Sequence, residues 1–243
     1  MEECFVVHPD FPAYRGRMEY VCLDCGARYP GDSLLYACPQ CGGVFLLENL
    51  DFERLKERDG AAWRELFDAR AATRDTALKG IFRYYELLAP LLEQEDIVYL
   101  GEGLTPIVEA APALRDRVGL PFAYKNDGQN PSASFKDRGM ACAFSYLKWL
   151  CRRHEWDEVL TVCASTGDTS AAAALYAAYV GTPLKSVVLL PHGKVTPQQL
   201  SQPLGSGATV LELPGVFDDC MKVVEHLAEN YRVALLNSKN SWR

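Results

Sequence analysis

The sequence predicts an α/β protein with a parallel sheet, preceded by a small β-rich module. From about residue 97 onward, short β-branched runs alternate with amphipathic stretches, which is typical of parallel sheets with helices on both faces. Residues 1–50 differ, because they are rich in Cys, Pro, Gly and Tyr and have no helical period. Ligands of parallel sheets bind where the strands end, so we expect the chemistry in loops that follow strands.

The elements follow in order along the chain. Residues 52–70 predict a helix, because apolar side chains recur among dense charge, and a short helix is expected near residues 81–92. Gly181 is the typical end of an Ala-rich helix. Strands are predicted at 122–125, 159–163, 186–190, 208–213 and 233–236, and helices at 135–152, 169–179, 195–202 and 217–230. This pattern divides the chain into the first module (1–50), a helical linker region (51–96) and an α/β region.

Composition and charge exclude several classes of function. The formal net charge of -7 disfavours a nucleic-acid partner, because phosphate backbones require a basic face. No segment is long and apolar enough to span a bilayer, and the N-terminus lacks the basic flank and apolar run of a secretion signal. The nine cysteines then fit a reducing compartment. We therefore expect a cytoplasmic protein with neither nucleic-acid nor membrane partners.

Four cysteines predict a structural metal site. Cys22 and Cys25 form one CxxC pair, Cys38 and Cys41 form another, and twelve residues separate the pairs. Glycines after each pair allow the tight turn that points two sulfurs at one ion. Four thiolates suit tetrahedral Zn²⁺ and leave no open ligand position, so the site would be structural. The alternatives are cysteine pairs without metal, reduced or disulfide-bonded, and a rubredoxin-like iron site.

One lysine is a candidate for catalysis and lies in residues 130–140 (Asn-Pro-Ser-Ala-Ser-Phe-Lys-Asp-Arg-Gly-Met). Lys136 is placed where a turn enters a helix, beside an acid and an arginine. Such a lysine can be held in a cleft with a shifted pKa, as an imine-forming lysine requires. The residues alone allow equally that Lys136 is a surface lysine paired with Asp137.

Five motifs, in order and over nearly the whole chain, resemble those of threonine synthases and their pyridoxal-phosphate (PLP) relatives of fold type II. The segment 130–140 resembles the motif of the PLP lysine. The others are Gly-Glu-Gly-Leu-Thr-Pro at 101–106, Tyr-Lys-Asn-Asp-Gly-Gln-Asn at 124–130, Ser-Thr-Gly-Asp-Thr at 165–169 and Asn-Ser-Lys-Asn-Ser-Trp-Arg at 237–243. Some threonine synthases also have an N-terminal zinc-ribbon-like module, which residues 1–50 resemble.

The resemblance implies a reaction and a set of site residues. PLP would be held by Lys136, whose amine would also move protons while O-phosphohomoserine and water become threonine and phosphate. Asp168, where many relatives have Asn, would face the 3'-oxygen of PLP. The substrate would be bound by Ser165, Thr166 and Thr169 at its carboxylate and by Asn237, Ser238 and Arg243 at its phosphate. Without the resemblance, these loops are a plain helix N-cap (Thr166 or Asp168) and a strand end with turn residues.

The resemblance also implies a domain plan. Residues 97–139 would begin the larger PLP domain, and residues 140–243 would form the smaller parallel α/β domain. Family members continue for roughly as much chain again, so we expect an incomplete larger domain, exposed apolar surface near residues 97–135, and no activity of this chain alone. A homodimer is allowed. The alternatives are a related PLP enzyme (cysteate synthase or threonine dehydratase) and a non-catalytic zinc-ribbon module beside a decayed PLP domain.

Overall fold

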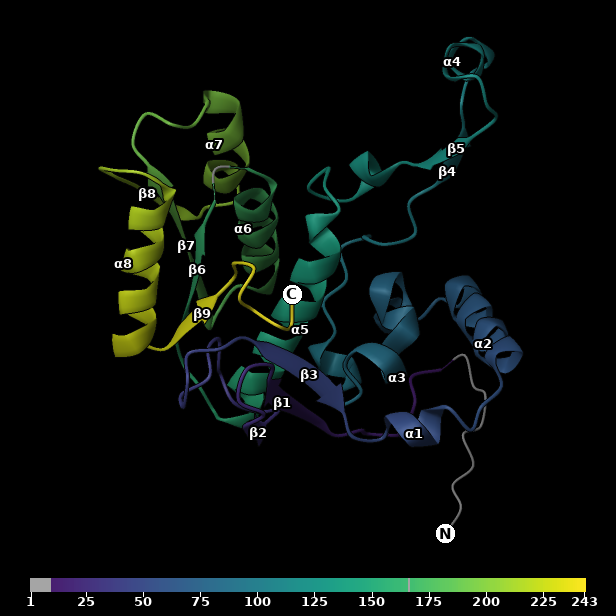
Figure 1. The fold of residues 1–243 in the computed structure, drawn as a ribbon, viewed down its shortest axis with the longest axis horizontal. Helices are drawn as coiled ribbons and strands as arrows, with labels where there is room; N and C mark the ends of the chain where they lie inside the picture. The colour runs from purple at the N-terminus through teal and green to yellow at the C-terminus, as the bar shows by residue number, and fades with distance from the viewer. Residues whose placement is uncertain (1–9, 166) are drawn as a thin grey trace.

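The computed structural model describes residues 10–165 and 167–243 (Figure 1). Its largest sheet has four parallel strands in the order β8-β7-β6-β9. These strands are β6 (Val159–Ala164), β7 (Leu184–Pro191), β8 (Thr209–Leu213) and β9 (Val233–Leu235). All four were predicted, and the parallel α/β expectation is confirmed.

Helices cover both faces of this sheet, as predicted (Figure 1). One face packs on α8 (Phe217–Asn230), and the other packs on α6 (Asp168–Val180), with α5 (Lys136–Arg153) behind it. The alternation along β6 explains this arrangement, because Val162 and Ala164 enter the core on the α8 side while Val159 and Cys163 enter the core shared with α5. Helix α7 (Pro197–Gly205) packs beside α6.

The cysteine-rich module is a three-stranded antiparallel sheet in the order β2-β1-β3. Its strands are β1 (Met18–Cys22), β2 (Arg28–Pro30) and β3 (Phe45–Asn49). Alternate residues of β1 are buried, and they join the same hydrophobic cluster as Phe144 and Leu147 of α5. Below, "cysteine module" means residues 10–50. Its apolar face is therefore completed by α5 rather than by a core of its own.

The predicted helix at 52–70 is wrong in one respect, since two helices occupy it: α1 (Phe52–Leu55) and α2 (Gly60–Ala72). Gly60 is a poor helix former, and Trp63 Nε1 donates to the Leu55 carbonyl across the break, 3.1 Å away. The segment predicted near 81–92 contains a 3₁₀ turn (Gly80–Tyr84) and α3 (Tyr85–Leu88). A buried ion pair, Arg70 with Glu86, joins α2 to α3.

An excursion of antiparallel strands and a short helix projects from the body (Figure 1). It contains β4 (Ile107–Glu109), α4 (Pro112–Val118) and β5 (Ala123–Lys125), of which only β5 was predicted. Ile107 is 75% exposed and Leu120 is 52% exposed. The expected apolar surface near residues 97–135 is thus confirmed. Within the described residues, no helix combines the length and apolarity needed to cross a membrane.

Candidate active site

Lys136 begins helix α5, directly after a turn in which the Ala133 amide donates to the Asn130 carbonyl (2.8 Å). The lysine is half-buried, its Nζ lies 4.5 Å from the centre of the Phe135 ring, and it forms no ion pair within the described residues. Asp137 is fully buried and accepts a hydrogen bond from the Ser132 amide (2.7 Å). The alternative of a surface Lys136–Asp137 pair is therefore wrong.

The loop predicted to bind the carboxylate follows β6 and opens α6, as expected, although Thr166 lies outside the described residues. Asp168 is exposed and is the first residue of α6, so it does not cap that helix; Gly167 has the N-cap position. Ser134 Oγ donates to Asp168 Oδ2 (3.0 Å) and links the lysine turn to this loop. Ser165 Oγ accepts from the Gly167 amide (3.4 Å).

The segment predicted to bind phosphate has two structural roles. Asn237 is buried, and its side-chain amide exchanges two hydrogen bonds with the backbone of Ala164, at 3.0 and 2.7 Å. It therefore fixes the end of β6, where the carboxylate loop begins. Ser238 is exposed. The guanidinium of Arg243 donates to Thr169 Oγ1 (3.0 Å), on the first turn of α6.

Arg243 also lies against the first turn of α5. A Cβ added to Gly139 would be 3.0 Å from Arg243 Cγ, so only glycine allows this approach without movement. Gly139 is three residues from Lys136, which places the two on the same face of the helix. Burial lowers the pKa of Arg243, but an arginine remains charged at neutral pH. The stem of Arg243 therefore packs one helical turn from Lys136, while its charged guanidinium reaches Thr169 on α6.

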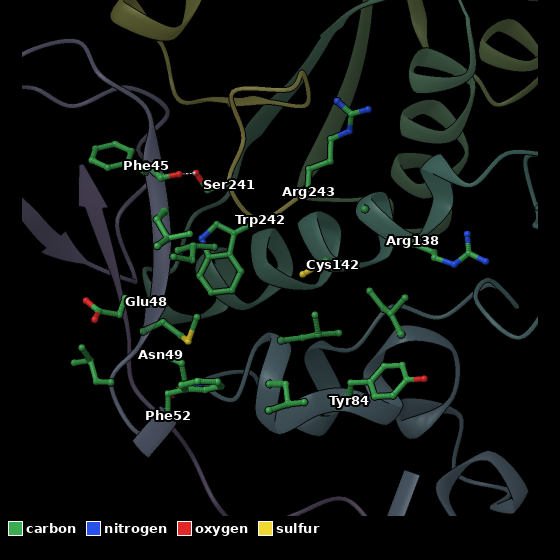
Figure 2. A pocket seen from close by; sticks show the side chains of 18 of the residues that line it. Phe45, Glu48, Asn49, Phe52, Tyr84, Arg138, Cys142, Ser241, Trp242 and Arg243 are labelled. Carbon is green, nitrogen blue, oxygen red and sulfur yellow. Dashed lines mark hydrogen bonds between the residues drawn. The ribbon is translucent and has the colours of Figure 1, made fainter. Parts of the chain in front are cut away.

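Lys136 and Arg243 open into one cavity of about 1250 Å³. Figure 2 shows Arg138, Cys142 and Arg243 on its α5 side and the residues of β3 and α1 opposite. Ser238 also lines it. Ser165, Asp168, Thr169 and Asn237 are not among the described lining residues. Of these four, Thr169 is hydrogen-bonded to a lining residue, Arg243.

Sequence reasoning missed a polar network beside Lys136. Arg138 donates to both carboxylate oxygens of Asp127, at 2.8 and 2.9 Å, and Thr105 Oγ1 donates to the same carboxylate (2.8 Å). These hydrogen bonds, chiefly those of Arg138, lower the pKa of Asp127 to about 2. The network joins three of the motifs noted above. Their order in the sequence was visible, but their pairing in space was not.

A second missed contact lies deeper. The hydroxyl of Tyr176 donates to Glu102 Oε2 (2.9 Å), and both side chains are buried. Burial raises the pKa of Glu102, although hydrogen bonds from the Leu100 amide and the Tyr176 hydroxyl oppose this rise. Glu102 Oε1 has no hydrogen-bond partner among the described residues. This contact ties the motif at 101–106 to α6.

The four predicted cysteines converge in the cysteine module. Their Sγ atoms all lie within 4.8 Å of one another, with Cys22–Cys41 at 3.5 Å and Cys25–Cys38 at 3.7 Å. Tetrahedral zinc with bonds of about 2.3 Å needs sulfurs roughly 3.8 Å apart, so the four fit such an ion. The cysteines are free thiols, which excludes the disulfide alternative in this structure. Gly26 and Gly42 have positive φ angles, as the predicted turns require.

These features define a class of protein. A parallel α/β domain, with a lysine at a helix N-terminus whose amine forms no ion pair within the described residues, suits an enzyme that holds an anionic carbonyl cofactor through its lysine. A family model described as pyridoxal-phosphate dependent enzyme matches residues 98–242, more than half of the chain. The chain belongs to this family, and the Lys136 amine, which lines the cavity, fits its cofactor.

Several threonine synthases are similar to this chain. The chain is 38% identical over 224 residues to that of Methanocaldococcus jannaschii, covering 91% of this chain and 50% of the relative. It is 34% identical over 229 residues to that of Methanosarcina acetivorans, covering 91% and 49%. Threonine synthase 2, chloroplastic, of Arabidopsis thaliana is 35% identical over 222 residues, covering 88% and 41%.

The fold agrees with the expectation of PLP fold type II. A crystal structure of PLP-bound threonine synthase from Brucella melitensis superimposes with a TM-score of 0.54 at 22% identity, covering 92% of this chain and 48% of that one. The chain spans about half the length of the relatives it matches.

Proposed function

We propose that this chain is part of a threonine-synthase-like enzyme that uses PLP to convert O-phosphohomoserine and water into threonine and phosphate. The observation that carries the proposal is the common position of Lys136 and Arg243. Both line one cavity, and Gly139, one turn from the lysine, contacts the arginine. An arginine in the same cavity as the cofactor-holding lysine offers a planar set of donors for the phosphate of a phosphorylated substrate.

Lys136 has the chemical task in this proposal. PLP, when bound, supplies an electron sink for the carbanion that forms at the substrate Cα. The Lys136 amine holds the cofactor and then, once free, removes and returns protons at Cα and Cβ. The Lys136 amine suits this work because, within the described residues, it forms no ion pair and its Nζ contacts only the Phe135 ring.

The loop after β6 would receive the amino-acid carboxylate. Ser165, Thr166 and Thr169 are the proposed contacts, together with the free N–H groups at the start of α6, whose dipole favours an anion. Asp168 is proposed to face the 3'-oxygen of PLP. Its hydrogen bond from Ser134 supports this, since it ties Asp168 to the lysine turn.

The phosphate would be bound by Ser238 and Arg243. An arginine offers a planar set of donors, of which Thr169 occupies one in this structure. We propose that Asn237 takes part by positioning, because its side-chain amide already bonds to the backbone of Ala164. It would keep the carboxylate loop and the phosphate segment in register.

We also propose that Cys22, Cys25, Cys38 and Cys41 bind one structural Zn²⁺. The sulfur spacing supports tetrahedral coordination, and four protein ligands leave no position for substrate. The free thiols and the net charge of -7 further support a cytoplasmic protein that binds neither nucleic acid nor membrane. We propose that the chain is divided into units at residues 1–50, 51–96, 97–139 and 140–243. A homodimer is compatible with this division.

The test is phosphate release from O-phosphohomoserine by the longest purified form of the protein, loaded with PLP. We expect release with this substrate and little turnover of phosphoserine or threonine. Arg243→Ala should raise the KM for O-phosphohomoserine at least tenfold. Arg232 is exposed and does not line the cavity, so Arg232→Ala should leave this KM unchanged. Preference for phosphoserine would favour a cysteate synthase, and preference for threonine would favour a dehydratase. No turnover of any of the three substrates would favour a non-catalytic module.

A further inference from the structure

The cysteine module contacts the segment that carries Arg243. Ser241 Oγ donates to the Phe45 carbonyl (3.0 Å), the dashed line in Figure 2, and Trp242 Nε1 donates to the Tyr20 hydroxyl (2.7 Å). Phe45 is on β3 and Tyr20 is on β1. The two residues before Arg243 are therefore each bonded to a different strand of the module.

These contacts are buried and closely packed. Trp242 and Tyr20 are 2% and 1% exposed. The Trp242 ring stacks on Tyr146 of α5 at 4.1 Å between centres, and the Tyr146 hydroxyl lies 3.2 Å from that of Tyr20. Tyr146 also donates to the Gly31 carbonyl (2.8 Å). Trp242 thus fills a slot between the module and α5, where its indole N–H has one specific acceptor.

One predicted metal ligand, Cys22, is the last residue of β1. Cys22 is the direct partner of Phe45 across β1 and β3, so the backbone that receives the Ser241 hydrogen bond is paired with a ligand. The Tyr29 hydroxyl lies 3.5 Å from Cys38 Sγ, and its ring packs edge-on against Phe45. Each CxxC pair is therefore one contact away from Phe45.

Local hydrogen bonds order the backbone of the C-terminal segment, because the Arg243 amide donates to the Asn240 carbonyl (3.2 Å) and the Trp242 amide donates to Asn240 Oδ1 (2.9 Å). After β9, Asn240 donates to the Leu235 carbonyl (2.8 Å) and the Asn240 amide to Asn237 (3.0 Å), which stabilises the first turn. Beyond it, the side chains of Ser241 and Trp242 take their hydrogen-bond partners from the module. An irregular segment loses conformational freedom when it is ordered, and these contacts offset that cost at the residues next to Arg243.

We propose that the cysteine module is a positioning device for Arg243. Tyr20, Ser241 and Trp242 are its positioning residues. When the four cysteines hold their ion, β1 and β3 keep the Phe45 carbonyl and the Tyr20 hydroxyl in place, and these fix the backbone from which Arg243 reaches Thr169. The effect on substrate affinity rests on the proposed role of Arg243 in binding phosphate; the coupling between module and segment does not.

Hydrogen exchange of the peptide 237–243 tests the coupling without any activity. We expect removal of zinc with a chelator to accelerate its exchange at least fivefold, the effect of losing one hydrogen bond, while α8 stays unchanged. Tyr20→Phe and Ser241→Ala keep the metal ligands and should each accelerate exchange of this peptide. Tyr231→Phe and Ser206→Ala, at residues outside these contacts, serve as matched controls. Unchanged exchange after zinc removal and in both variants would overturn the proposal.

A second readout separates the coupling from the proposed function. In PLP-loaded protein, Tyr20→Phe and Ser241→Ala should weaken binding of O-phosphohomoserine about fivefold and leave borohydride labelling of Lys136 by PLP unchanged. Faster exchange with unaltered substrate affinity would refute the role of Arg243 in phosphate binding and keep the coupling. Equal loss of PLP labelling would refute a specific effect on Arg243 and point to general loosening instead.

Discussion

The cysteine module and the parallel-sheet region are ordered by different means. The strands of the sheet region lie between helices, and most residues of α5 and β6 are buried in the apolar cores on the two faces of the sheet. The module has three short strands and buries one face against α5. The sheet region therefore relies on its apolar core, whereas the module relies on four thiols and on a neighbour.

This difference decides what each region contributes to the site. The sheet region supplies the lysine and the loop after β6 from helix and strand ends, which its core holds in place. The module supplies no residue with proposed chemistry, but it holds the residues before Arg243. Metal loss should thus affect one end of the site and spare the other.

The largest expected effect breaks the module alone. Cys41→Ser should eliminate bound zinc. Either this variant or removal of zinc should reduce the near-ultraviolet circular dichroism of the tyrosines packed in the module, because a structural zinc site supplies about 10–16 kcal/mol of apparent binding free energy. Far-ultraviolet helix content should remain. Cys220→Ser, at a buried cysteine of α8 outside the cluster, should keep the zinc. Loss of all helix signal with the metal would contradict the independence of the sheet region.

The next largest effect is a loss of stability of the sheet region when its apolar core is altered. Phe144 of α5 is fully buried and packs near the Tyr176 ring. Phe144→Ala should lower the free energy of unfolding by about 3–5 kcal/mol in urea titrations. Zinc content should stay at one ion per chain. A loss below about 1 kcal/mol would mean that the apolar core contributes less than the comparison requires.

A smaller effect is expected where the two ends of the site are joined. Asn237→Ala removes two buried hydrogen bonds to Ala164 and should lower the free energy of unfolding by about 2 kcal/mol, since both backbone groups lose their partner. Asn230→Ala is the matched control, because Asn230 is an exposed asparagine at the end of α8. Equal losses in the two variants would argue against a joining role for Asn237.

The smallest effect concerns the partly exposed Arg138–Asp127 pair. Arg138 lowers the pKa of Asp127 to about 2, below its value of about 3.9 in an unfolded chain. The stabilisation is therefore present above about pH 4 and is lost as the pH falls through about 2. Asp127→Asn should cost about 0.5–1 kcal/mol at pH 6, a difference that disappears near pH 2. A constant difference across this range would exclude the charge as its cause.

The sequence predicted the sheet region well because its elements are long and periodic. Helix α5 and strands β6 to β9 were expected almost residue by residue, and the cysteine spacing anticipated the four-sulfur cluster. The three-residue strand β4 was not predicted, whereas β5 and β9, which have the same length, were. The break before Gly60 was likewise hidden, since charge and apolar residues continue across it.

The sequence proposed the candidate residues of the site but not the contacts between them. Lys136, Arg243 and the loop after β6 were found through motif resemblance. The side-chain bonds of Asn237, and the pairing of Arg138 with Asp127, depend on tertiary packing between distant segments. The attachment of Trp242 to Tyr20 joins residues 222 positions apart, which no local pattern encodes.

The central claim, that Lys136 holds PLP, is tested most directly by chemical labelling. The protein is mixed with one equivalent of PLP, reduced with borohydride and digested, and the pyridoxyl group is located by mass spectrometry. We expect a single adduct on Lys136, and none in Lys136→Ala. Lys148, on the same helix, should stay unlabelled. Label spread over several lysines, or retained in Lys136→Ala, would contradict the claim.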